Sequence, residues 1–177
     1  MPWKVDGWVD SDHAGDIVTR KSTSGLVGMF GTHLIKSSST VQDPIGLSSG
    51  EAEYYAAVKG GSFLLGFKSL LEDLGITVKL NLIVKTDSSA AKGMFTRRGL
   101  GKQRHISTRY LWIQDRVARK DLTIEKVGTK DQLADILTKP TAQRDIARVS
   151  EAVGLQFREG SATKQKKVYR QSAQENY

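Results

Sequence analysis

Hydrophobic and polar residues alternate along the first stretch of the chain. KVDGWVDSD places Val5 and Val9 on one side of an extended segment and Asp6 and Asp10 on the other. This period-two alternation is typical of a strand. After a turn-rich segment, LVGMFG and THLIKSS form two short β-like runs that meet near Gly31. The pattern therefore predicts a strand followed by an antiparallel hairpin.

Helical spacing replaces the alternation between residues 48 and 74, where apolar residues recur three or four positions apart. Gly75 is suited to end this helix, and Gly60 and Gly61 allow a kink in its middle. LNLIVKTD then reads as an apolar-rich strand, followed by a short helix that starts at Ser88. The middle of the chain is therefore predicted to be helix, strand, helix.

The last third of the chain begins with a basic loop, TRRGLGKQRH, and a helical run over residues 107–120. LTIEKV predicts a short strand, and TKDQLADILTKP predicts a last helix that Pro140 closes. The order of elements predicts an α/β fold, a mixed sheet covered by helices. We expect one domain over residues 1–157 and a polar, basic, disordered tail over residues 158–177.

Composition narrows the class of protein. The 177 residues contain no cysteine and carry a net charge of +8, which favours polyanionic partners, nucleic acid first. No apolar run is long enough to cross a membrane, and the first residues lack the order of a signal peptide. We therefore expect an intracellular protein, in the cytoplasm or nucleus, that is not secreted and has no membrane partner. Without cysteine, any metal must be held by oxygen or histidine.

Four carboxylates fall at ends of predicted elements, and they are Asp10, Glu53, Asp87 and Asp135. Carboxylates that gather from distant parts of a chain repel one another unless cations neutralise them. Magnesium, with oxygen ligands, suits such a cluster. Two such ions, with Mn²⁺ as a substitute for Mg²⁺, can promote in-line attack by water on a phosphodiester without a cysteine, serine or histidine nucleophile. The four positions together predict a two-metal hydrolase.

Two neighbouring glutamates in LSSGEAEYYAAVKG need to be separated. Ser48 and Glu51 have the spacing of a capping box, in which the serine accepts from the Glu51 amide and the Glu51 carboxylate accepts from the Ser48 amide. On a helical wheel the apolar stripe passes about 60° from Glu53 and about 140° from Glu51. We therefore assign Glu51 to the cap and Glu53 to the site.

Two aspartates are alternatives to the proposed ligands. Asp12 points to the same side of the first strand as Asp10, so geometry alone does not separate them. Asp131 shares a helix face with Asp135, but a Thr129-x-x-Gln132 capping box would place Asp131 in the first helical turn. No such local role in helix capping is predicted for Asp135.

Four segments in order resemble the ribonuclease H domain of copia-type (Ty1/copia) retrotransposon polyproteins. They are VDSDHAGDIVTRKSTSG, IGLSSGEAEYYAAVKG, KTDSSAAKGMFTRRGLGKQRHISTRYLWIQD and VGTKDQLADILTKP. The resemblance implies a five-stranded mixed sheet, its first three strands antiparallel, flanked by helices. It implies cleavage of the RNA strand of an RNA/DNA hybrid with two magnesium ions. The implied ligands are Asp10, Glu53, Asp87 and Asp135.

The chain departs from the family at His13, where the first motif usually carries tryptophan, and at SSSTVQDP, which is less basic than the lysine-bearing form of the family. Many cellular ribonucleases H place a histidine on a loop before the last carboxylate. The VGTKDQ loop has none, and copia-type domains resemble this chain in that respect. His105 is a candidate for that assisting role, although a structural role is the better interpretation. The resemblance therefore leaves this role unassigned.

The basic loop after the Asp87 helix offers phosphate contacts, at Arg97, Arg98, Lys102, Arg104 and His105. The expected partner is an RNA/DNA hybrid duplex, bound by a monomer, with reverse transcriptase and integrase regions of a parent polyprotein as further partners. Two alternatives stay open. One is a catalytically silent nucleic-acid-binding module with the same fold, and the other is a related nuclease that cuts DNA.

Overall fold

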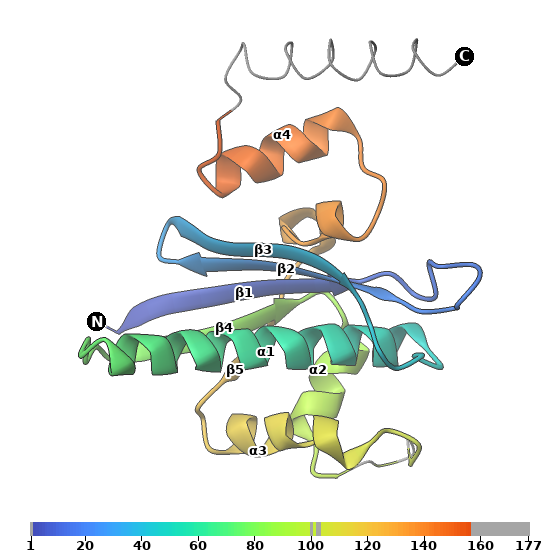
Figure 1. The fold of residues 1–177 in the computed structure, drawn as a ribbon, viewed down its shortest axis with the longest axis horizontal. Coiled ribbons are helices and arrows are strands. Elements are labelled where there is room, and N and C mark those ends of the chain that lie inside the picture. The colour runs from blue at the N-terminus through green and yellow to red at the C-terminus, as the bar shows by residue number, and fades with distance from the viewer. Residues whose placement is uncertain (1, 100, 102–103, 157–177) are drawn as a thin grey trace, which may run out of the picture.

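Five strands form one mixed sheet in the order β3-β2-β1-β4-β5 in the computed structural model, which describes residues 2–99, 101 and 104–156 (Figure 1). The strands are β1 (Trp3–Ser11), β2 (Thr23–Phe30), β3 (His33–Val41), β4 (Leu80–Thr86) and β5 (Thr123–Lys126). β2 pairs antiparallel with both β1 and β3, whereas β4 pairs parallel with both β1 and β5. The predicted α/β fold, with three antiparallel strands first, is confirmed.

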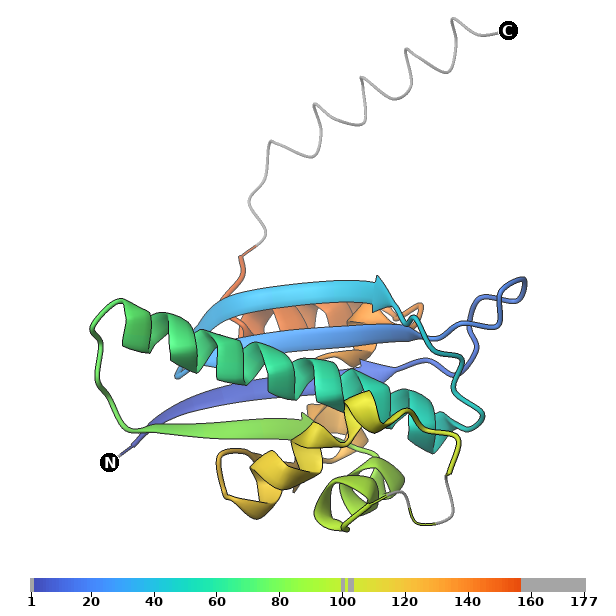
Figure 2. The same ribbon diagram turned by 60° about the horizontal axis from the view of Figure 1, so that its bottom comes forward.

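Helices cover both faces of the sheet. α1 (Ser49–Asp73), α2 (Ser89–Thr96) and α3 (Trp112–Ala118) lie on one face, and α4 (Gln143–Ala152) lies on the other (Figures 1 and 2).

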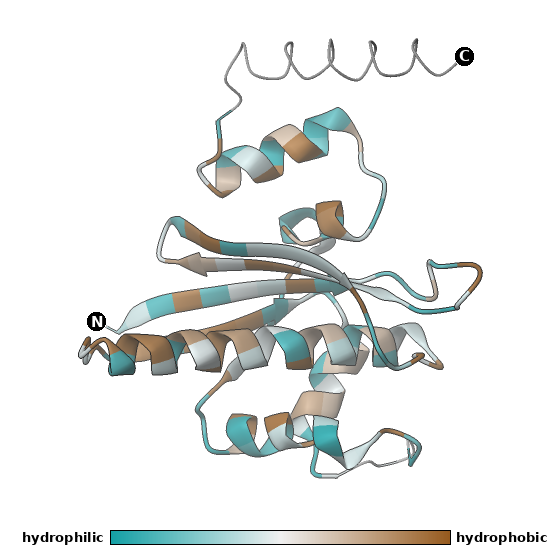
Figure 3. Ribbon diagram, viewed as in Figure 1, coloured by the Kyte–Doolittle hydropathy of each residue, from teal (hydrophilic) through white to brown (hydrophobic). Residues whose placement is uncertain are grey.

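Each face of the sheet has its own apolar cluster. Leu26 of β2 packs with Val9 of β1 and Leu64 of α1, whereas its neighbour Val27 packs with Val149 of α4. This is the alternation of side chains expected along a strand. Apolar residues recur along α1, shown brown in Figure 3, because one side of this long helix covers the sheet.

α1 begins and ends at the predicted positions. The Ser48 hydroxyl accepts from the Glu51 N–H at 3.3 Å, and Gly75 follows the helix with a φ of +76°. The helix runs unbroken through its two central glycines. A Cβ on Gly60 would lie 2.4 Å from Val9 Cγ1, so this glycine permits close packing of α1 against β1.

The helix predicted over residues 129–140 is wrong. The segment forms two short 3₁₀ turns, Thr129–Asp131 and Asp135–Leu137, without the predicted capping box, and Gln132 lies between the turns. The Gln132 side chain is fully buried; its amide donates to the Val9 carbonyl at 2.9 Å, and its Oε1 accepts from the Ala134 N–H at 3.3 Å. These bonds tie the segment to β1 and compete with helical hydrogen bonding.

Two further elements differ from the pattern-based prediction. The run over residues 107–120 divides into a 3₁₀ turn, Thr108–Tyr110, and α3. α4 was not predicted, although Val149 and Val153 have helical spacing and pack on β2 from the second face. The predicted tail over residues 158–177 lies outside the described residues. Within the described part of the chain, no helix is both long enough and apolar enough to span a membrane.

Candidate metal centre

Two of the predicted carboxylates lie at the ends of neighbouring parallel strands. Asp10 is near the end of β1, and Asp87 directly follows β4. Because β1 and β4 run in the same direction, their carboxyl ends meet at one edge of the sheet. The register pairs Trp8 with Lys85, which puts Asp10 and Asp87 at matching positions. This topology brings together residues that are 77 positions apart in the sequence (87 − 10).

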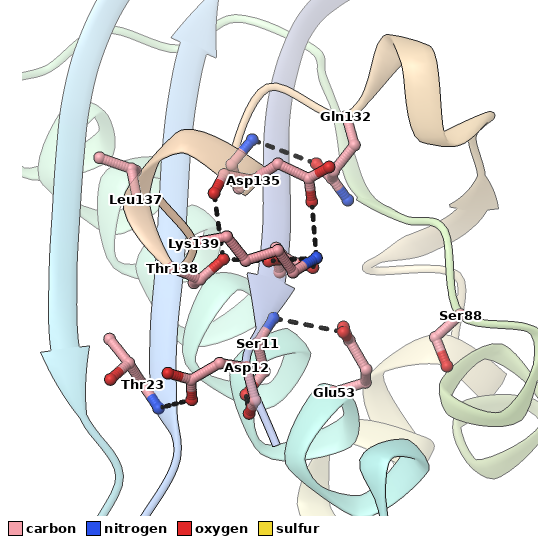
Figure 4. Close-up of polar contacts among 12 residues, drawn as sticks. Ser11, Asp12, Thr23, Glu53, Ser88, Gln132, Asp135, Leu137, Thr138 and Lys139 are labelled. Carbon is pink, nitrogen blue, oxygen red and sulfur yellow. Dashed lines mark hydrogen bonds and ion pairs between the residues drawn. The ribbon is translucent and has the colours of Figure 1, made fainter. Parts of the chain in front are cut away.

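Glu53 reaches the same edge from the second turn of α1. One oxygen each from Asp10, Glu53 and Asp87 lies within 4.8 Å of the other two. Glu53 Oε1 accepts from the Ser11 N–H at 3.3 Å (Figure 4), whereas Oε2 is buried and has no hydrogen-bond partner among the described residues. The α1 register therefore directs Glu53 into the acidic cluster, as the wheel geometry predicted.

The acidic cluster is electrostatically unfavourable without a cation. Burial, together with the nearby carboxylates of Asp10 and Asp87, raises the pKa of Glu53 to about 8. Buried polar groups are nearly always hydrogen-bonded, so the free Glu53 oxygen points to a missing partner. Hard oxygen donors with negative charge are the ligands that divalent magnesium or manganese prefers. The residues present therefore fit a divalent cation.

Asp135 lies apart from these three carboxylates and faces Asp10 across a lysine. Lys139 Nζ is 3.1 Å from Asp135 Oδ1 (Figure 4). It is also 3.2 Å from Asp10 Oδ2. Burial and the neighbouring Asp10 raise the pKa of Asp135, although Lys139 opposes this change. The Thr138 hydroxyl also donates to Asp10. Asp10 is thus shared between the acidic cluster and Asp135.

Lys139 and Thr138 were not among the residues selected from the sequence. The i, i+4 spacing of Asp135 and Lys139 was a usable signal, since these positions often form ion pairs. What the sequence does not show is that Thr138 and Lys139 also contact Asp10, 128 and 129 positions away.

The neighbouring acids have local roles. The Asp12 carboxylate accepts from the Thr23 N–H and so joins the two ends of the loop between β1 and β2. The Glu51 carboxylate accepts from the Leu47 N–H at 2.9 Å, rather than from the Ser48 N–H as the capping-box prediction had it. Its other oxygen is 3.0 Å from His105 Nε2. Glu51 is therefore buried, as Glu53 is, but it stabilises the start of α1.

The predicted phosphate-contacting loop is only partly described. Arg97 is half-buried at the end of α2, whereas Arg98 and Arg104 are exposed. Lys102 lies outside the described residues. The contact of His105 Nε2 with the Glu51 carboxylate gives that histidine a structural partner at the start of α1.

Two surface hollows lie near these elements. One of about 430 Å³ is lined by Asp135 together with the cationic side chains of Lys130, Arg144 and Arg148. A larger one, of about 580 Å³, lies over α1 and is lined by Lys59 among others. The four predicted carboxylates all belong to the described residues, and none of them lines the larger hollow. The larger hollow is therefore not the candidate metal site.

Among solved structures, the fold resembles LC11-RNase H1, which was isolated from compost by a metagenomic approach. The match has a TM-score of 0.51 and 18% sequence identity, and it covers 76% of this chain and 92% of that one. The fold is therefore that of ribonuclease H, as the sequence motifs implied.

The sequence is similar to segments of retrovirus-related Pol polyproteins. It is 34% identical over 152 residues to that of transposon TNT 1-94 from Nicotiana tabacum and 33% identical over 152 residues to that of transposon RE2 from Arabidopsis thaliana. Each match covers 85% of this chain but only 11% and 10% of the polyproteins, so the chain spans about a tenth of the length of these curated relatives. No family model matches the chain. The expected resemblance to copia-type retrotransposon polyproteins is confirmed.

Proposed function

We propose that this chain is a metal-dependent ribonuclease H domain that hydrolyses the RNA strand of RNA/DNA hybrids and derives from a retrotransposon polyprotein. The observation that carries the proposal is the convergence of Asp10, Glu53 and Asp87, with one buried Glu53 oxygen lacking a partner among the described residues. The ribonuclease H fold and the Pol relatives support the same class of reaction.

Each carboxylate has a distinct part in the proposed site. Asp10, Glu53 and Asp87 would hold one divalent ion, and Asp10 with Asp135 would hold a second. Divalent ions bound there would offset the charge of the carboxylates and of a substrate phosphate and would acidify water beside the scissile bond. Asp10 and Asp87 are attached to the sheet and Glu53 to a long helix, so their oxygens are held in place before substrate arrives.

Substrate binding is proposed to use cations around this edge of the sheet. Arg98 and Arg104 are exposed on the loop after α2 and are suited to contact phosphates, and we extend the same role to Arg97, Lys102 and His105. A hybrid is read mainly by its shape and backbone. Reverse transcriptase and integrase regions would be neighbours within a parent polyprotein, as the Pol relatives suggest.

The test compares three labelled duplexes, RNA/DNA hybrid, double-stranded RNA and double-stranded DNA, each with Mg²⁺, Mn²⁺ or EDTA. The proposal expects cleavage of the RNA strand of the hybrid with either metal and none in EDTA. Binding of the hybrid with no cleavage in either metal would contradict an enzyme and leave a nucleic-acid-binding module. Cleavage of DNA alone would contradict the proposed substrate.

A further inference from the structure

Lys139 places a positive charge inside the proposed site. Its ammonium lies between two carboxylates, 3.2 Å from Asp10 Oδ2, 3.3 Å from Asp10 Oδ1 and 3.1 Å from Asp135 Oδ1. The Asp10 side chain is almost fully buried, at 1% exposure, whereas that of Lys139 is 46% exposed. Lys139 is thus a cation that neutralises a buried acid while its own side chain remains open to solvent.

The local backbone supports this placement of Lys139. Lys139 N–H donates to the Asp135 carbonyl at 3.1 Å, and the Thr138 hydroxyl donates to the Asp10 carboxylate, with the Asp135 carbonyl 3.2 Å away as an alternative acceptor. The turn that carries Asp135 therefore delivers Thr138 and Lys139 to Asp10 together. The ammonium position follows from these backbone contacts as well as from charge attraction.

Glu53 and Asp87 have no such cation. Among the ion pairs of the described residues, none involves Glu53 or Asp87, although one oxygen of each lies within 4.8 Å of an Asp10 oxygen. The ammonium therefore pairs with only one of the three clustered carboxylates, that of Asp10, whereas it pairs with both Asp10 and Asp135 at the second proposed position.

We propose that Lys139 is a displaceable internal counter-ion that makes binding of the two divalent ions sequential. This inference rests on the proposed function and adds how the site is loaded. The first ion enters the Asp10, Glu53 and Asp87 cluster, where Asp10 alone of the three ligands pairs with the ammonium. The second ion must move the Lys139 ammonium away from Asp10 and Asp135, because two cations cannot share the same oxygens without strong repulsion. The half-exposed side chain can swing into solvent without unfolding the turn.

The test measures Mn²⁺ binding to the metal-free protein without nucleic acid, with calorimetry for affinities and electron paramagnetic resonance for the number of bound ions. Lys139→Met removes the ammonium and keeps much of the side-chain volume. We expect this change to increase the affinity for the second Mn²⁺ ion by at least about tenfold more than the affinity for the first. A factor of this size lies within the range of typical coupling between sites. Lys139→Arg, which keeps the charge, is expected to bind the second ion as weakly as the wild type.

Lys85→Met is the matched control. Lys85 also pairs with a β1 carboxylate, that of Asp6 at 3.2 Å, and its ammonium lies over the Trp8 ring. The Lys85→Met control loses one positive charge but keeps the ion pair of Lys139 with Asp10. Its two Mn²⁺ binding constants should therefore match those of the wild type. Circular dichroism in EDTA verifies that each variant is folded. If Lys139→Met does not fold, Lys139→Gln, which shortens the side chain and removes the charge, replaces it with the same expectation.

The possible failures are distinguishable. If the wild type binds no Mn²⁺ and Asp10→Asn behaves identically, the proposed function fails. If the wild type binds Mn²⁺ through Asp10 but the charge-removing variant has an unchanged or weaker second constant, only the counter-ion role is overturned. Equal tightening in the Lys85→Met control would also overturn it, because the effect would then follow from net charge alone.

Discussion

Glu53→Gln is expected to abolish cleavage and, at the same time, to stabilise the metal-free protein at alkaline pH. The change removes a negative charge from a side chain that is 8% exposed and keeps an oxygen that can accept from the Ser11 N–H. Cleavage is lost because an amide is a poor ligand for a divalent ion compared with a carboxylate. Stability should rise because the charge of Glu53 is unfavourable in the folded state without metal.

The magnitude follows from the pKa of Glu53, which burial and the charges of Asp10 and Asp87 raise from 4.5 to about 8. A raised carboxyl pKa means that the folded state binds the proton more tightly than the unfolded state. The stabilisation of the folded state by this proton is fully present below about pH 4.5 and is lost as the pH rises to about 8. At about 1.4 kcal/mol per pH unit, the loss is on the order of 3 to 5 kcal/mol. Burying the new amide NH₂ offsets about 1 to 3 kcal/mol of this.

The assay is urea unfolding followed by circular dichroism in EDTA at pH 5 and pH 8. Glu53→Gln is expected to gain on the order of 1 to 3 kcal/mol at pH 8, and less at pH 5, where the wild-type carboxyl is largely protonated. Glu51→Gln is the control, since its amide oxygen can still accept from the Leu47 N–H and the residue is not a proposed ligand. It should keep cleavage and show no gain at pH 8. A Glu53→Gln variant that is less stable than the wild type at pH 8, or one that cleaves the hybrid, would contradict this prediction.

Three further outcomes are expected. Asp135→Asn should lose cleavage but still bind a first Mn²⁺ ion, measured by calorimetry, because Asp135 lies outside the three-carboxylate cluster; loss of all Mn²⁺ binding would contradict this. Arg98→Ala should weaken hybrid binding and reduce the slope of log K against log salt by about one, whereas Arg119→Ala, whose arginine pairs with an acid on α3, should not. Gly60→Ala should lower the free energy of unfolding by about 1 to 3 kcal/mol, since its Cβ would lie 2.4 Å from Val9 Cγ1, and an unchanged urea midpoint would count against that packing.

The sequence predicted the elements whose signals are local. The strand ending at Asp10, the Ser48 cap and the Gly75 stop all agree with the structure, because alternation, capping and a positive φ are properties of short segments. The convergence of Asp10 and Asp87 was predictable once the neighbouring strands were taken to run in parallel.

The segment around the last carboxylate was not predictable from local signals. Its helical spacing is overridden by a tertiary contact, the buried Gln132 side chain that bonds to the Val9 carbonyl of β1. Lys139 was missed for a related reason, since its contact with Asp10 exists only after that segment has packed on the sheet. α4 has clear amphipathic spacing, and its apolar side is explained by its packing on β2. Local pattern therefore selected the proposed ligands, whereas tertiary packing determined what surrounds them.

The carboxylates around Asp10 are proposed to support metal-dependent hydrolysis of RNA in a hybrid duplex. The decisive experiment follows the release of end-labelled RNA from an RNA/DNA hybrid by the wild type and by Asp10→Asn at equal folded concentration, with Mg²⁺ and then with EDTA. We expect RNA fragments from the wild type with Mg²⁺ and none from the variant or in EDTA. Intact RNA with the wild type in Mg²⁺, or equal cleavage by Asp10→Asn, would rule out this role for the carboxylates.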